Sequence, residues 1–157
     1  MSVALAGTAA PISGERAFDK LKSLAGDWEV HGDAMEVAGP VASYRVTAGG
    51  TVVMETLMPG TEYEMITMYH MDGDDLLLTH YCSMGNQPRM KLDRKSSTLE
   101  RLGFAFVDGT GMRRKSTHMH THEIAFVDPD HVISTWGVSE GDDAPVETKR
   151  FSLVRKK

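Results

Sequence analysis

The sequence contains a single cysteine, Cys82, so no internal disulfide can form, as is typical of proteins from a reducing compartment. No apolar run approaches the roughly 20 residues that a membrane-spanning helix requires. The N-terminal residues are small and apolar, but they lack the positive segment and the strong apolar core of a signal peptide. We therefore predict a cytoplasmic protein that does not enter a membrane.

An excess of basic residues is also missing. The 17 Lys and Arg residues are outnumbered by 22 Asp and Glu residues, for a net charge of −5, which argues against a nucleic-acid-binding surface. The short basic stretch at 150–157 is interpreted as a solvated terminus. The sequence contains no phosphate-binding loop, nucleophile elbow or dinucleotide-binding fingerprint. We therefore predict no catalytic residue, and the cofactor stays unknown.

One helical segment is expected, near the N-terminus. With 157 residues the chain has the length of a single domain, and we expect residues 1–13 to be disordered. Ser13 is a suitable N-cap, Phe18, Leu21 and Leu24 follow at helical spacing, and Gly26 is a suitable stop. This pattern predicts a helix of about three turns.

The rest of the chain reads as short strands separated by turns rich in Gly, Pro, Asn and Asp. The predicted strands are 27–33, 41–48, 51–58, 62–71, 75–83, 88–94, 98–107, 114–127, 131–138 and 146–155. Ten strands with hairpin-length links favour an all-β, up-and-down antiparallel barrel. A sandwich is the alternative, but it would need long crossover connections that the sequence lacks.

Three histidines stand at alternate positions, His118, His120 and His122, and Ile124 and Phe126 continue the same alternation. Alternate residues of a strand point to one face, so this spacing predicts an interior partly lined by imidazoles. Short hairpin loops would place His122 opposite Trp136, Ile124 opposite Ser134 and Phe126 opposite Val132. They would also place Leu102, Phe104 and Phe106 on the face of His118 and His120.

From these alignments we predict a ligand-binding cavity within the barrel. Its predicted lining residues are His118, His120, His122, His80, Phe104, Trp136 and Tyr69. The sequence does not determine which face of the predicted strands 62–71 and 75–83 points inward. One alternative places Tyr63, Met65, Thr67 and Tyr69 inside with Leu76, Leu78, His80 and Cys82; the other places Ile66, Met68 and His70 inside with Leu77, Thr79 and Tyr81.

The histidine row also raises the possibility of a metal. Adjacent members lie about 6.6–6.8 Å apart along a strand, so all three cannot bind one ion. Two of them with a third ligand from His131, Cys82 or His80 could do so, and Glu55 could contribute if it points inward. We predict binding of a small, partly apolar molecule. The alternatives are a metal- or haem-binding protein or enzyme that uses the row, and a filled barrel without a ligand.

Two features at opposite ends of the chain carry a resemblance to a known family. Gly26-Asp27-Trp28 begins the first strand, and Phe151-Ser152-Leu153-Val154-Arg155 forms the last. This pairing resembles the calycins, which include lipocalins, fatty-acid-binding proteins and nitrobindin-like haem binders. The chain also looks like a bacterial lipocalin-like domain family of unknown function. The resemblance implies that Trp28 packs near the closed end of the barrel with Arg155 across it, and a nitrobindin-like protein would bind haem through one histidine.

Overall fold

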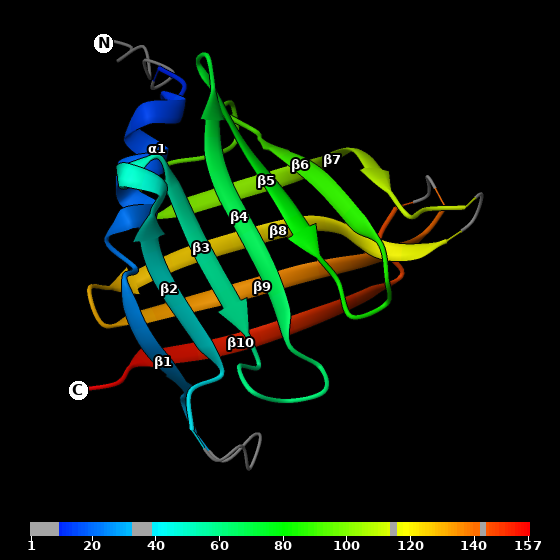
Figure 1. Ribbon diagram of the computed structural model, residues 1–157. Coiled ribbons are helices and arrows are strands. Elements are labelled where there is room, and N and C mark those ends of the chain that lie inside the picture. The colour runs from blue at the N-terminus through cyan, green and yellow to red at the C-terminus, as the bar shows by residue number, and fades with distance from the viewer. Residues whose placement is uncertain (1–9, 33–38, 114–115, 142–143) are drawn as a thin grey trace, which may run out of the picture.

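The structure is a computed structural model that describes residues 10–32, 39–113, 116–141 and 144–157. Ten antiparallel strands form a closed barrel in which each strand pairs with its neighbours along the chain and β1 pairs with β10 (Figure 1). The strands are β1 (Gly26–Val30), β2 (Ala42–Thr47), β3 (Val52–Leu57), β4 (Met65–Asp72), β5 (Asp75–Tyr81), β6 (Gln87–Leu92), β7 (Arg101–Thr110), β8 (Thr117–Asp128), β9 (His131–Glu140) and β10 (Glu147–Arg155). The predicted up-and-down barrel is therefore confirmed.

The helix α1 (Gly14–Lys22) lies at one end of the barrel, beside the turn between β4 and β5 (Figure 1). The Ser13 hydroxyl caps it, accepting a hydrogen bond from the Arg16 N–H at 3.2 Å, as predicted. The helix is shorter than expected, because it ends at Lys22 with Ser23 as its C-cap, and Gly26 instead begins β1 with a positive φ of 131°. The prediction that Gly26 stops the helix was therefore wrong.

The predicted disorder of residues 1–13 falls largely outside the described residues, which begin at Ala10. Within them, Ile12 is buried in the core, and its carbonyl accepts a hydrogen bond from the Arg94 guanidinium at 2.9 Å. The predicted disorder is therefore wrong for Ile12, which covers apolar surface that would otherwise meet water.

The register of β4 and β5 decides which of their faces points inward. Thr67 pairs with His80 and Tyr69 with Leu78, and all four side chains are buried. The first of the two alternatives is therefore correct over most of its length. Tyr63 is the exception, with 60% of its surface exposed, because β4 begins only at Met65 and the alternation does not extend back to it.

The register of β8 against β9 is confirmed at its three predicted positions. Phe126 pairs with Val132, Ile124 with Ser134, and His122 with Trp136. On the other side of β8, Leu102 pairs with Ile124 and Phe104 with His122. Both hairpins therefore place aromatic and imidazole rings together, as the hairpin geometry predicts.

A β-bulge interrupts the histidine row. Met119 pairs with Val138 while Thr121 pairs with the adjacent Gly137, so His120 is an additional residue in β8. Such an insertion shifts the alternation of side chains beyond it. The expectation that His118, His120 and His122 form one continuous row is therefore not met, because strict period-two alternation does not extend across a bulge.

Trp28 and Arg155 meet at the closure between β1 and β10, where they are cross-strand partners. Trp28 is fully buried, and its indole N–H donates to the Leu24 carbonyl at 2.8 Å. The Arg155 guanidinium lies 4.4 Å from the centre of the Trp28 ring and donates to the carbonyls of Ser23, Ala25 and Pro129. The predicted contact between these two side chains is confirmed, and it ties the chain after α1 to the last strand.

Candidate ligand-binding pocket

A row of polar side chains crosses four neighbouring strands inside the barrel. Tyr44 of β2 pairs with Glu55 of β3, Glu55 with Thr67 of β4, and Thr67 with His80 of β5. All four residues are completely buried. Because directly opposed residues in adjacent strands point to the same face, a single register brings these four side chains into contact.

Glu55 is the acidic centre of this row. The Tyr44 hydroxyl donates to Glu55 Oε1 at 2.5 Å, and the Tyr69 hydroxyl lies 3.1 Å from Oε2. Burial raises the pKa of Glu55, although its interactions with Tyr44, Thr67 and Tyr69 act in the opposite direction. Burial also raises the pKa values of Tyr44 and Tyr69 well above 10.0, so both phenols stay protonated.

His122 extends the network toward β9. Its ring stacks on Trp136 with 3.7 Å between ring centres, its Nδ1 lies 3.2 Å from the Thr135 carbonyl, and its Nε2 lies 3.0 Å from the Tyr69 hydroxyl. Burial lowers the pKa of His122 to about 3, so the ring is neutral at pH 7. A carbonyl only accepts hydrogen bonds, so the neutral ring carries its proton on Nδ1 and presents Nε2 to Tyr69 as an acceptor.

A pocket of about 270 Å³ opens at the end of the barrel opposite α1. It lies between the chain segments that link β3 to β4 and β5 to β6, with β8, β9 and β10 behind them. Its wall is mainly apolar and rich in sulfur: Val41, Leu57, Met58, Tyr63, Met65, Cys82, Met84, Met119 and Phe151 line it, together with His80, Ser83, Trp136 and Lys149. Such a wall suits the hydrocarbon part of a small molecule.

Two residues of the pocket lining each carry a buried polar atom that has no hydrogen-bond partner within the described part of the chain. These atoms are Nε2 of His80 and the indole Nε1 of Trp136. The two rings are neighbours, with 4.6 Å between their centres. Burial lowers the pKa of His80 to about 4, so this ring is also neutral at pH 7. Buried polar groups are nearly always hydrogen-bonded, so a neighbouring pair without partners indicates a place where a bound molecule supplies them.

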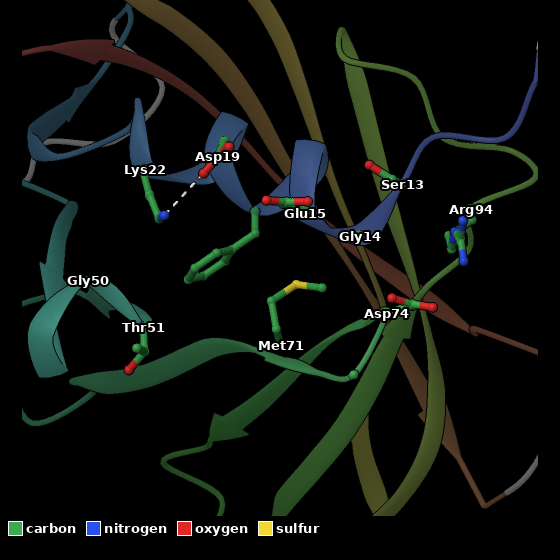
Figure 2. A pocket seen from close by; sticks show the side chains of 12 residues that line it. Ser13, Gly14, Glu15, Asp19, Lys22, Gly50, Thr51, Met71, Asp74 and Arg94 are labelled. Carbon is green, nitrogen blue, oxygen red and sulfur yellow. Dashed lines mark hydrogen bonds and ion pairs between the residues drawn. The ribbon is translucent and has the colours of Figure 1, made fainter.

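A larger hollow of about 690 Å³ lies at the other end, between α1, the β4–β5 turn and Arg94 (Figure 2). Phe18 and Met71 border it, and its remaining lining consists largely of exposed side chains of both charges, including the Asp19–Lys22 ion pair of 3.0 Å. None of the unpaired buried side-chain atoms found in the described residues belongs to its lining. The smaller pocket is therefore the stronger candidate, because its apolar lining includes two residues with unpaired buried side-chain atoms.

The predicted cavity-lining residues occupy three places. His80 and Trp136 line the pocket. Tyr69, Phe104 and His122 belong to the packed interior, with 5.8 Å between the Tyr69 and Phe104 ring centres. His118, which is buried, and His120, which is half-buried, form a separate cluster in which His118 Nε2 lies 3.0 Å from His120 Nδ1 and both rings contact Phe106.

The structure does not bring the other proposed metal ligands to the row. His131 contacts Ser152 at 2.8 Å and the ring of His31, whereas Glu55 accepts a hydrogen bond from Tyr44 and contacts the Tyr69 hydroxyl. Across residues 10–32, 39–113, 116–141 and 144–157, no group of three or more His, Cys, Asp or Glu side chains is arranged to hold a metal ion.

Sequence reasoning missed Tyr44 and left Glu55 unplaced. The available signal was the alternation of β3, where Val53, Glu55 and Leu57 share one parity and are all buried. An acidic residue between two apolar residues of one face is unusual unless a partner meets it inside. The middle strands are rich in methionine, but nothing in the spacing of these residues identifies Met65 and Met119 as neighbours in one pocket.

No protein-family model matches this chain, and a search of curated proteins found no match either. The described residues contain no helix long and apolar enough to cross a membrane. The geometry of the pocket is therefore the main guide to function.

Proposed function

We propose that the protein binds a small, partly apolar molecule in the pocket at the open end of the barrel. The observation that carries this proposal is the neighbouring pair of unpaired buried atoms, His80 Nε2 and Trp136 Nε1, in an otherwise apolar wall. A buried polar group without a partner costs about 1–3 kcal/mol, and a ligand that pairs with both atoms removes this cost. The apolar wall then contributes affinity by burying the hydrocarbon part.

The pocket volume limits the size of the ligand. At about 270 Å³ it lies just below the range of roughly 300–1,000 Å³ that is usual for drug-sized ligands. The proposed occupant is therefore a compact molecule. Flexible Met58, Met65 and Met119 side chains allow the wall to adjust to its shape.

We also propose a relationship to the calycins, and to the bacterial lipocalin-like domains among them. The ten-stranded barrel and the packing of Arg155 on Trp28 support it. Neither feature identifies the ligand, because one fold serves many functions.

The test uses the two tryptophans as separate reporters. Small alcohols, ethers and carboxylates are added to ¹⁵N-labelled protein, and the two indole N–H signals are followed by NMR. Binding in the pocket shifts the Trp136 signal, while Trp28, whose N–H is bonded to Leu24, serves as an internal control. The proposal fails if saturating amounts of these probes leave the Trp136 signal unchanged.

A second candidate, a soft metal ion such as Cu(I), is favoured by one observation. On the same wall as His80, Cys82 Sγ and Met65 Sδ lie 4.0 Å apart, and thiolate and thioether ligands select Cu(I). The indole N–H of Trp136 is not a metal ligand, so this candidate leaves one of the two unpaired atoms unexplained. Metal analysis of the purified protein tests this candidate, and haemin addition tests the haem alternative.

A further inference from the structure

The hydrogen-bond partners of His80 determine which of its ring nitrogens carries the proton. Thr67 lies between Glu55 and His80 in the row of paired residues, and its Oγ1 is 3.0 Å from His80 Nδ1. The Glu55 carboxyl group, which belongs to the other cross-strand neighbour of Thr67, is the acceptor available to the Thr67 hydroxyl. A hydroxyl has only one hydrogen, so Thr67 donates it to Glu55 and accepts a hydrogen bond from His80 Nδ1–H.

This assignment defines the polar end of the pocket. With the proton on Nδ1, the Nε2 atom of neutral His80 is a bare, buried acceptor on a ring that lines the pocket. The Trp136 indole beside it is a donor and cannot accept. Two neighbouring rings of the pocket lining therefore carry one bare acceptor and one free donor.

Resting on the proposed function, we infer that the occupant carries a neutral hydroxyl group, as an alcohol or phenol, held between His80 Nε2 and Trp136 Nε1. A hydroxyl group matches both atoms, because its hydrogen bonds to Nε2 while its oxygen accepts from the indole N–H. The hydrocarbon part lies against Met65, Met119 and Phe151.

The same geometry disfavours a carboxylate of the same size. A carboxylate has no hydrogen for His80 Nε2, so its charge faces a lone pair. The cation on the pocket lining, Lys149, is exposed and already forms an ion pair with Glu147. The charge of a carboxylate would therefore lose water without gaining a buried partner. An ether accepts from Trp136 but leaves His80 unpaired.

The experiment compares three probes that share one hydrocarbon body: cyclohexylmethanol, cyclohexylmethyl methyl ether and cyclohexanecarboxylate. Dissociation constants are measured at pH 7 from the Trp136 indole signal. We expect the alcohol to bind at least about tenfold more tightly than either other probe, since each of them leaves a buried group unpaired. Equal or tighter binding of the ether or the carboxylate overturns the inference, although the pocket still binds ligands. If none of the three binds, the proposed function itself fails.

A variant separates the role of His80 from the effect of the hydrocarbon wall. In His80→Leu the preference for the alcohol over the ether should disappear, while the ether binds about as before. Met68→Leu, on the outer face of β4, is the matched control and should retain the preference. An unchanged preference in folded His80→Leu contradicts the role of His80.

The tautomer itself can be observed in the wild-type protein, so the inference does not depend on the variant folding. A long-range ¹H–¹⁵N spectrum distinguishes a protonated imidazole nitrogen from a bare one. The expected result at pH 7 is a protonated Nδ1 and an unprotonated Nε2 for His80. A proton on Nε2 instead would overturn the inference, because the pocket would then present two donors, and a ligand that only accepts would fit better.

Discussion

At the scale of single residues, the contact between Tyr69 and its two neighbours determines how protons are distributed in the core. The Tyr69 hydroxyl lies 3.0 Å from His122 Nε2 and 3.1 Å from Glu55 Oε2, but it has one hydrogen. Neutral His122 accepts that hydrogen, so the contact with Glu55 needs a proton on the carboxyl group. The raised pKa of buried Glu55 agrees with this arrangement. Glu55 is thus expected to be a neutral acid that donates to Tyr69.

This assignment predicts that Glu55→Gln is tolerated. A glutamine amide can donate to Tyr69 and accept from Tyr44, so the free energy of unfolding at pH 7 should fall by less than about 1.5 kcal/mol. Glu55→Leu leaves the buried hydroxyl groups of Tyr44 and Thr67 without their acceptor and should cost about 2–6 kcal/mol. Urea denaturation of both variants checks the difference, and a loss in Glu55→Gln as large as that in Glu55→Leu would indicate an ionised Glu55.

A second residue-scale prediction concerns acid stability. The folded pKa values of His122 (about 3) and His80 (about 4) lie below the reference of about 6.5. The unfolded chain therefore binds more protons as the pH falls, so the stability from these residues is complete above pH 6.5 and declines below it. At pH 5 each histidine should lower the free energy of unfolding by about 2 kcal/mol relative to pH 7.5.

Urea midpoints at pH 7.5 and pH 5 measure this dependence in the wild type, His122→Gln and His80→Gln. In each variant, the decline of stability between pH 7.5 and pH 5 should be smaller by the contribution of the substituted histidine. His70→Gln is the control, because half-buried His70 lies on the outer face of β4 and should leave the pH dependence unchanged. If His122→Gln retains the complete wild-type decline, the pH dependence has another origin.

At the scale of elements, the packing of α1 on the β4–β5 turn depends on a close backbone approach. A Cβ atom added at Gly14 would lie 2.4 Å from the Asp74 carbonyl oxygen, which belongs to the backbone and cannot rotate away. The helix covers this end of the barrel with Phe18 and Leu21 buried beneath it. Gly14 is therefore required by the distance between helix and turn, not by its own dihedral angles.

We predict that Gly14→Ala destabilises the protein, although alanine is favoured over glycine in helices by roughly 1 kcal/mol. The clash should outweigh that gain, with a net cost of about 1–3 kcal/mol, as is usual for overpacked sites. Glu15→Ala, at the next and exposed position, is the control and should have little effect. Thermal denaturation gives the comparison, and a Gly14→Ala protein more stable than the wild type would contradict the close approach of α1 to the turn.

At the scale of the whole molecule, the barrel is closed by the pairing of its first and last strands. Trp28 and Arg155 lie at this closure, and Arg155 also binds carbonyl groups from the segment after α1 and from the β8–β9 turn. The Arg155 side chain thus connects the first and last strands with the β8–β9 turn, which is far from the first strand in sequence. Removing the Arg155 side chain should weaken the closure of the barrel more than removing a contact between residues that are close in sequence.

Trp28→Ala should therefore lower the free energy of unfolding by about 3–5 kcal/mol, as large aromatic truncations in cores do. Arg155→Lys should also be destabilising, because a lysine keeps the charge but cannot bond several carbonyls with one planar group. Chemical denaturation measures both, with Lys157→Ala at the exposed C-terminus as the control. A Trp28→Ala protein with near wild-type stability would show that this contact does not support the closure.

Local patterns in the sequence were sufficient for the elements of the fold. The predicted strands agree with the observed ones to within three residues at each described end, and Ser13 caps the helix as expected. Turn residues, and the alternation of apolar and polar side chains, depend on a few neighbouring positions. Because the links between the strands are short, each strand pairs with the next one along the chain. The contact between Trp28 and Arg155 was also predictable, although from family resemblance and not from local pattern.

The site was determined by tertiary structure. The bulge at His120 separates His122 from His118, and the register across β2 to β5 aligns Tyr44, Glu55, Thr67 and His80. The pocket combines side chains from strands that are far apart in the chain, so no local pattern marks its members. His80 and Trp136 were both predicted to line a cavity, but their unpaired nitrogens follow only from which atoms remain without partners once all ten strands have packed.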